Sequence, residues 1–197
     1  MNIRYVFSTH KNFNTLIVFL IWVLLLFFPA NLFGGSSPVI LAFGDSLTAG
    51  FGVPDSESYP ARLQNILVEN GYTHKVVNAG VSGDTTAGGV RRIKWLMKNN
   101  PEVVILELGA NDGLRGLSLQ EMESNEEYTV EFEKTFFRLA EKYKLPLVPF
   151  FLEGVAGIRE HTQSDGIHPL GSGYSIVVKM IWEYLQPLLN ASSKTKT

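Results

Sequence analysis

The chain has 197 residues, which suits one domain with room for an N-terminal extension. Its formal net charge of -2 gives no reason to expect a nucleic-acid partner. Cysteine is absent, which excludes disulfides, a thiol nucleophile and a lipid-modified cysteine. The histidines lack the close helical spacing of a zinc site, and we expect neither a metal nor another cofactor.

The N-terminal stretch has the layout of an export signal. The first 44 residues contain no Asp or Glu, and basic residues precede an apolar run at residues 16–28. Small and polar residues follow that run, as they do in secretory signal peptides. The run is short for a membrane span, which needs about 20 residues. We therefore predict that residues 1–36 are a signal peptide, or an anchor that tethers the chain to the inner membrane through residues 16–33. The protein is then periplasmic or secreted.

Beyond the leader, strand patterns alternate with helix patterns. Val39–Phe43 is predicted as a buried strand, residues 59–70 as a helix and Val76–Ala79 as a second strand. Residues 84–86 can cap the next helix. The apolar face of that helix, read from its spacing, consists of Val90, Ile93, Leu96 and Met97.

The second half continues the alternation. Residues 103–108 are predicted as a third strand, 118–144 as mainly helical, Leu147–Leu152 as a last strand and 172–189 as a closing helix. Pro149 places that last strand at a sheet edge. The tail at 190–197 is predicted to be disordered.

Alternating strands and helices indicate an α/β fold with a parallel sheet covered on both faces. Such sheets bind ligands at the carboxyl ends of their strands. Polar residues follow each predicted strand, so their side chains should converge at one edge. The segments concerned are Gly44–Leu47, Gly80–Asp84, Gly109–Asp112 and Asp165–His168.

These residue types fit acyl transfer. A serine hydroxyl becomes a good nucleophile when a neighbouring base takes its proton, and His168 is the histidine placed to do that for Ser46. Asp165 can accept from the other ring nitrogen and fix the tautomer. The backbone N–H groups of Ser46 and Gly83 and the side-chain amide of Asn111 can meet the developing oxyanion.

Four blocks of the chain resemble the motif blocks of the SGNH, or GDSL, hydrolases. They are Gly-Asp-Ser-Leu at 44–47, Gly83 in SGDTT, GAND at 109–112 and DGIHP at 165–169. The stretches VVNAGVSGDTT, LELGANDGLRGL and PLVPFFLEGVAG are similar to one subgroup of bacterial, mostly periplasmic arylesterases and acyl-CoA thioesterase/lysophospholipases. The resemblance covers residues 39 to about 189, which sets the expected domain at 37–189.

The resemblance implies a flavodoxin-like three-layer αβα sandwich. It also implies Ser46, Asp165 and His168 as the catalytic triad, and Ser46, Gly83 and Asn111 as the oxyanion hole. Supporting roles are expected for Asp45, Asp84 and Asp112. The first two can cap helices or orient the loops around Ser46, and Asp112 can bond loop amides.

One departure from the family pattern concerns the scaffold. A helix-plus-strand unit, of order 30 residues, is missing between the GAND loop and the last strand. The family sheet has five strands in the order 2-1-3-4-5, whereas this chain is expected to have about four. Either Leu147–Leu152 pairs directly with residues 103–108, which we expect, or a groove stays open there. Closing the gap could move the Asp165–His168 loop by about 4.8 Å, the spacing of strands.

The leading hypothesis is an exported monomeric serine hydrolase that cleaves small acyl esters or thioesters, including aryl and short-chain esters, acyl-CoA and lysophospholipids. An alternative is an inactive or vestigial SGNH-like module, because of the missing unit. A carbohydrate O-deacetylase would share the same site residues. Membrane association, if any, is expected through the N-terminal apolar segment.

Overall fold

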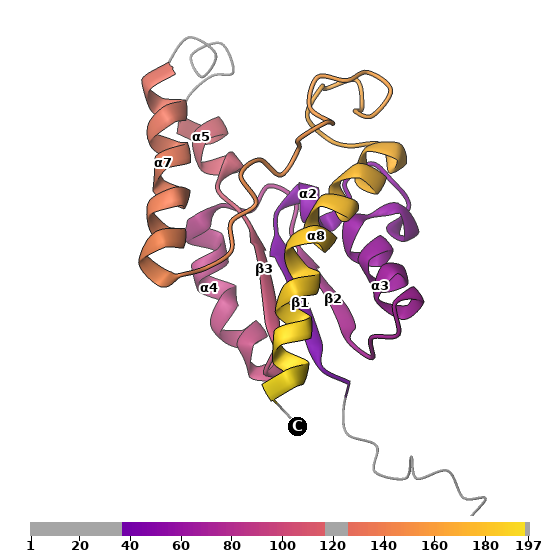
Figure 1. The fold of residues 1–197 in the computed structure, drawn as a ribbon. Coiled ribbons are helices and arrows are strands. Elements are labelled where there is room, and N and C mark those ends of the chain that lie inside the picture. The colour runs from indigo at the N-terminus through magenta and orange to yellow at the C-terminus, as the bar shows by residue number, and fades with distance from the viewer. Residues whose placement is uncertain (1–36, 117–125, 196–197) are drawn as a thin grey trace, which may run out of the picture. The chain divides into compact units, whose positions relative to one another are not determined.

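The computed structural model describes residues 37–116 and 126–195, and the strands in them form a three-stranded parallel sheet in the order β2-β1-β3 (Figure 1). The strands are β1 (Val39–Gly44), β2 (Lys75–Gly80) and β3 (Val103–Glu107). β1 is central, because its residue Ile40 pairs with Val76 on one side and with Val103 on the other. The carboxyl ends of all three strands therefore meet at one edge.

Helices follow each strand, which confirms the predicted α/β fold. The predicted helices at 59–70 and after residues 84–86 are present. Of the helix predicted at 118–144, the described part runs from residue 126 to 143, and the helix predicted at 172–189 extends over residues 171–195. The elements are α2 (Ser46–Ala49), the 3-10 turn η1 (Asp55–Glu57), α3 (Tyr59–Glu69), α4 (Thr86–Leu96), the 3-10 turn η2 (Met97–Asn99), α5 (Ala110–Gly116), α7 (Glu126–Tyr143) and α8 (Gly171–Thr195).

The buried strand β1 separates two hydrophobic cores. Ile40 and Ala42 pack with residues of α3 and α8, whereas Leu41 and Phe43 pack with Leu96 of α4. Successive residues of a strand face opposite sides of the sheet, so these contacts place α3 and α8 on one face and α4 on the other (Figure 1). The expected three layers are present.

The predicted apolar face of α4 is only half right. Ile93 and Leu96 pack toward the sheet, but Val90 is 74% exposed and Met97 is 43% exposed. Two glycines explain the difference. Gly88 and Gly89 are buried, and a Cβ at Gly89 would lie 2.7 Å from the side chain of Leu108. The glycine surface of α4 therefore approaches the sheet in place of Val90.

The predicted last strand is wrong. Residues 147–152 contain an irregular segment, a bend at Pro149 and the start of a series of turns. Proline lacks the amide that a ladder needs, and hydrogen bonds from Glu153 N to Phe150 O and from Val155 N to Leu152 O close local turns instead. Leu152 and Val155 fix the segment by burial in the core of α3 and α8. In residues 37–116 and 126–195 the sheet therefore has three strands, where about four were expected.

The outer edge of β3 consequently carries no strand within the described residues, and the expected direct pairing with 147–152 does not occur. Two apolar side chains of β3 show the consequence. Leu106 is 64% exposed and Val104 is 37% exposed.

The prediction of a disordered tail is also wrong for residues 190–195, which continue α8. Leu189 is buried in the core, Asn190 Oδ1 accepts a hydrogen bond from Tyr72 Oη at 2.7 Å, and Ser192 donates to Glu102. These contacts hold the last turns of the helix against residues that precede β2 and β3.

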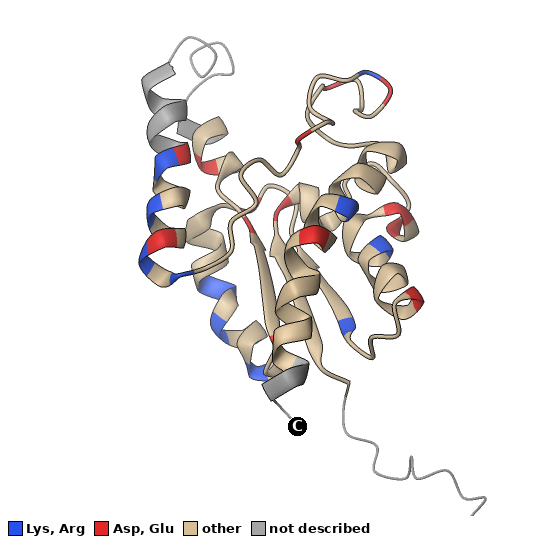
Figure 2. Cartoon of the chain, in the orientation of Figure 1, with Lys and Arg blue, Asp and Glu red and all other residues tan. Residues whose placement is uncertain are grey.

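The surface of the described part carries both signs of charge on its helices and loops (Figure 2). In residues 37–116 and 126–195, no helix combines the length and apolar character that crossing a membrane requires. The signal peptide or anchor predicted at residues 1–36 lies outside the described residues.

Candidate active site

The first site element is the turn between β1 and α2. The buried strand ends at Gly44, and Asp45 then caps α2 by accepting a hydrogen bond from Leu47 N at 3.0 Å. This cap places Ser46 in the first turn of α2, at the carboxyl edge of the sheet. A Cβ at Gly44 would lie 2.0 Å from Thr48 Oγ1, so the residue before the cap has to be glycine.

The second element is the loop that precedes α8. Thr162 and Pro169 form an antiparallel bridge at its base, and Gln163 N donates to His168 O at 2.8 Å. Asp165 Oδ1 accepts from His168 N at 3.0 Å and from Ile167 N at 2.9 Å. These bonds give the loop a defined shape that presents both side chains on one side.

The two elements meet through a chain of three side chains. His168 Nε2 lies 2.9 Å from Ser46 Oγ, and His168 Nδ1 lies 2.7 Å from Asp165 Oδ2. Burial acts to raise the pKa of the Asp165 carboxyl. The backbone amides that it accepts from, together with the His168 ring, outweigh burial and lower that pKa to about 2. Asp165 therefore stays ionised and holds Nδ1 as a donor, which leaves Nε2 free to accept from the serine hydroxyl.

The predicted oxyanion donors lie on neighbouring turns. Asn111, in the first turn of α5, donates through Nδ2 to Asp45 Oδ2 at 2.8 Å. An amide nitrogen carries two hydrogens, so the second remains available for a substrate oxygen. Gly83 follows β2 in a turn closed by Asp84 N to Val81 O, and its φ of 77° is a left-handed conformation that favours glycine.

The predicted supporting acids each bind a different part of this edge. Asp45 is the cap described above and is 1% exposed. Asp84 accepts from Arg92 Nε at 2.7 Å, and Arg92 Nη2 donates to Gly44 O at 2.8 Å, which ties the Gly83 turn to the end of β1. Asp112 accepts from Thr86 N at 2.9 Å and joins the first turns of α5 and α4.

Sequence reasoning missed several residues that support the edge. Glu107 lies beneath the Ser46 turn and accepts from Thr48 Oγ1 at 2.9 Å. Tyr174 of α8 donates to Leu47 O at 2.9 Å and so ties the closing helix to α2. A lone carboxylate inside the apolar run VVILEL was a signal that could have identified Glu107, whereas nothing local marks Arg92 or Tyr174.

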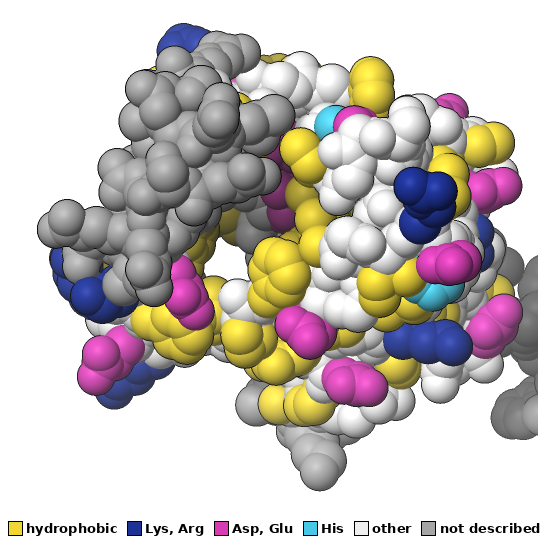
Figure 3. Space-filling view, turned by 90° about the horizontal axis from the view of Figure 1, so that it is seen from above, with side chains coloured by type: hydrophobic (Ala, Val, Ile, Leu, Met, Phe, Trp, Pro, Cys, Tyr) yellow, Lys and Arg dark blue, Asp and Glu magenta, His cyan; other side chains and the backbone are white. Residues whose placement is uncertain are grey.

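An exposed aromatic side chain lies beside the three hydrogen-bonded side chains of Ser46, His168 and Asp165. Phe51 is 50% exposed, and its ring lies 4.8 Å from the His168 ring. Its backbone is fixed, because Phe51 N donates to Ser46 O and Phe51 O accepts from Gln163. Figure 3 looks onto this end of the molecule and shows hydrophobic side chains beside a hollow.

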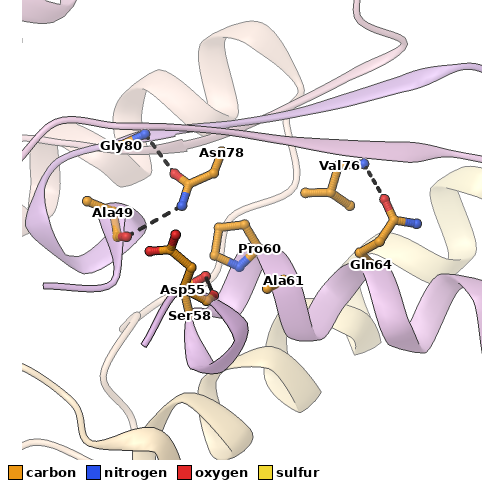
Figure 4. Close-up of a pocket in the computed structure, with 9 residues that line it drawn as sticks. All are labelled: Ala49, Asp55, Ser58, Pro60, Ala61, Gln64, Val76, Asn78 and Gly80. Atoms are coloured by element: carbon orange, nitrogen blue, oxygen red, sulfur yellow. Dashed lines mark hydrogen bonds between the residues drawn. The ribbon is translucent and has the colours of Figure 1, made fainter. Parts of the chain in front are cut away.

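A separate groove of about 490 Å³ lies along the outer edge of β2 (Figure 4). Its polar lining groups largely satisfy one another, since Gln64 accepts from Val76 N and Asn78 accepts from Gly80 N. Neither Ser46 nor His168 lines it. The groove is therefore not where the predicted residues meet.

A serine, histidine and aspartate joined in this order, beside amide groups at the carboxyl edge of a parallel sheet, form the arrangement that serine hydrolases use. Comparison with known proteins agrees. Residues 42–131 match the model of the GDSL-like lipase/acylhydrolase family. The chain belongs to this family, whose blocks it carries in order, and it is an SGNH-type hydrolase of the esterase and thioesterase kind.

Two similar sequences and one solved structure illustrate the relationship. Esterase TesA of Pseudomonas aeruginosa is 35% identical over 182 residues, which cover 78% of this chain and 90% of that protein. Thioesterase 1/protease 1/lysophospholipase L1 of Escherichia coli strain K12 is 33% identical over 221 residues, covering 98% and 100%. A crystal structure of TesA superposes with a TM-score of 0.70 at 35% identity, covering 76% of this chain and 99% of that one.

These alignments are consistent with the missing unit. The alignment with the E. coli protein runs over 221 residues, which is longer than this 197-residue chain. The relative therefore has segments without a counterpart here. Even so, the Ser46–His168 distance is within hydrogen-bond reach.

Proposed function

We propose that the protein hydrolyses carboxylic esters or thioesters through an acyl-enzyme formed on Ser46. The observation that carries the proposal is the 2.9 Å separation of Ser46 Oγ and His168 Nε2, with Asp165 bonded to the other ring nitrogen. Names of the relatives, an esterase and a thioesterase/lysophospholipase, support the class of substrate.

The proposed reaction begins when His168 Nε2 takes the hydroxyl proton as Ser46 Oγ attacks the carbonyl carbon. Asp165 stabilises the resulting imidazolium, which then protonates the leaving alcohol or thiol. The acyl group stays on Ser46 until His168 Nε2 takes a proton from a water that attacks the acyl carbon; the imidazolium then returns the proton to Ser46 Oγ as the bond to the acyl group breaks and the acid leaves. No cofactor enters these steps.

The negative oxygen of the tetrahedral intermediate is stabilised by hydrogen-bond donors that are already oriented before the substrate reacts. Ser46 N lies at the start of α2, and Asn111 Nδ2 is oriented by its bond to Asp45. The backbone amide of Gly83, on the turn after the adjacent strand, is the third proposed donor. Removing one such donor costs about 10²–10³ in kcat in comparable hydrolases.

The shortened scaffold does not separate the base from the nucleophile. The loop with Asp165 and His168 is held by the bridge at its base and by α8, which follows the loop and is hydrogen-bonded to α2. The strand that is absent next to β3 is not among these supports. This arrangement favours an active hydrolase over an inactive module.

Turnover of p-nitrophenyl acetate and butyrate tests the proposal, with Ser46→Ala as the control. We expect a burst of p-nitrophenol, and a mass increase of one acyl group on the wild-type protein when the reaction is quenched early. Thioesters of CoA, lysophospholipids and acetylated sugars in the same panel would identify the preferred substrate. Turnover no greater than that of Ser46→Ala, with no acylated protein, would support an inactive binding module.

A further inference from the structure

A second carboxyl group lies directly beneath the turn that carries Ser46. Glu107, the last residue of β3, accepts through Oε2 from Thr48 Oγ1 at 2.9 Å and from the Asp45 amide at 3.3 Å. The register of the sheet pairs Glu107 with Gly44, the residue before Asp45. The carboxyl groups of Asp45 and Glu107 therefore share one small space under the site.

Atoms around these two carboxyl groups are closely packed. A Cβ at Gly44 would lie 2.6 Å from Glu107 Oε2, and Asp45 is 1% exposed. Asp45 is fully engaged on its other side, because its two oxygens accept from Leu47 N and from Asn111 Nδ2.

Among the described residues, the groups that face Glu107 bring no positive charge. Besides Asp45 they are the hydroxyls of Thr48, of Tyr59 on α3 and of Tyr174 on α8, and burial raises the pKa of both tyrosines, so they stay neutral. The guanidinium that α4 contributes to this end of β1, that of Arg92, is bonded to Asp84 and to backbone carbonyls.

The acid that α5 contributes to this edge, Asp112, is bonded to Thr86 at the start of α4. A carboxyl group that lies beside a second one, with no cation bonded to either in the described part of the chain, is favoured in its protonated form. Burial, and then the charge of Asp45, raises the pKa of Glu107 to about 8. A hydrogen bond with the Asp45 side chain acts in the same direction.

We propose that Glu107 is a positioning residue, whose carboxyl proton is donated to the Asp45 carboxylate and keeps that carboxylate where it orients Asn111 and the Ser46 turn. Glu107 does not touch substrate. It acts through Asp45, which bonds Asn111 Nδ2 at 2.8 Å. When the proton is lost, two negative charges repel each other and the Asn111 amide turns away from the oxyanion.

The kinetic readout rests on the proposed ester hydrolysis. Glutamine has the shape of a protonated glutamate and cannot ionise, so the variants to compare are wild type, Glu107→Gln and the exposed-acid control Glu160→Gln. The rate constant kcat for p-nitrophenyl butyrate would be measured from pH 6 to 9.5, with spontaneous hydrolysis subtracted. We expect kcat of wild type and of Glu160→Gln to fall about tenfold between pH 7 and 9, as for one group with a pKa near 8, and that of Glu107→Gln to stay level. Parallel declines in wild type and Glu107→Gln would overturn the proposal.

A second readout does not depend on turnover. In ¹⁵N-labelled protein, the Asn111 side-chain amide, identified by its loss in Asn111→Ala, should shift with a midpoint near pH 8 in wild type and not in Glu107→Gln. In wild type alone, ¹³C signals of the carboxyl groups should include one glutamate that titrates near pH 8. If every carboxyl midpoint lies below about 6, or if the Asn111 amide is indifferent to pH, Glu107 does not have this role. A shifting amide in a protein without turnover would instead contradict only the proposed hydrolysis.

Discussion

Ser46 and His168 are hydrogen-bonded to each other, and in the proposed reaction neither side chain can act without the other. The hydroxyl needs the imidazole to accept its proton, and the imidazole has no substrate atom to act on without the hydroxyl. We predict that Ser46→Ala and His168→Ala each remove nearly all turnover, with losses on the order of 10⁶, and that the double variant is little worse than either. Single-turnover assays with p-nitrophenyl butyrate would measure this. Losses that multiply in the double variant would show that the two residues act separately.

Loss of Asn111 should affect kcat more than KM, because its amide is proposed to bind charge that exists only in the transition state. Asn111→Ala should lower kcat by about 10²–10³ and leave KM within a few-fold. Thr86→Ala, which removes a hydroxyl bonded to the neighbouring Asp112, is the matched control for disturbance of the same turn. An effect of Asn111→Ala mainly on KM would assign Asn111 to substrate binding in place of oxyanion stabilisation.

At the scale of elements, local patterns predicted most of the fold, and long-range contacts decided the rest. β1, α3, β2, α4 and β3 were predicted within a residue or two from their apolar residues, although the buried face of α4 was predicted only in part. The three residues that meet at the site were predicted from motifs at strand ends. The run Leu147–Leu152 has the composition of a buried strand, yet whether such a run forms a ladder depends on a partner edge that the sequence of the run does not contain. Glu107 was missed for a similar reason, since its role depends on a cap 62 residues away.

Burial of Leu152 should account for most of what the irregular segment at 147–152 contributes to stability, and a pair of variants can test this. Leu152 is 8% exposed and packs in the core of α3 and α8, whereas Phe150, two residues earlier, is 50% exposed. Leu152→Ala should lower the free energy of unfolding by about 2–5 kcal/mol, and Phe150→Ala by no more than about 0.5 kcal/mol. Urea unfolding followed by circular dichroism measures both. Equal effects of the two variants would mean that the segment does not pack in this way.

At the scale of the whole molecule, the end of α8 closes the domain against residues far away in the chain. Truncation after Leu189 removes the bonds from Tyr72 to Asn190 and from Ser192 to Glu102. Each bond contributes about 0.5–1.5 kcal/mol, so thermal unfolding of the truncated protein should indicate a loss of about 1–3 kcal/mol. Tyr72→Phe, which removes one of these bonds, should account for roughly half of it. A truncated protein as stable as the full chain would restore the original prediction of a disordered tail.

The Glu107 carboxyl should also give the whole molecule a pH-dependent stability. A free glutamate side chain has a pKa of 4.5, and in the folded protein burial and then Asp45 raise that of Glu107 to about 8. Between these values the folded state holds a proton that the unfolded state has lost, so stability falls as the pH rises, by up to about 1.4 kcal/mol per pH unit. The contribution is fully present below pH 4.5 and is lost as the pH passes 8. Glu107→Gln has no such proton, and its free energy of unfolding relative to wild type should therefore increase steadily from pH 5 to 8. Urea titrations of both proteins at each pH measure the difference, and a constant difference would place the ionised carboxylate in the folded state.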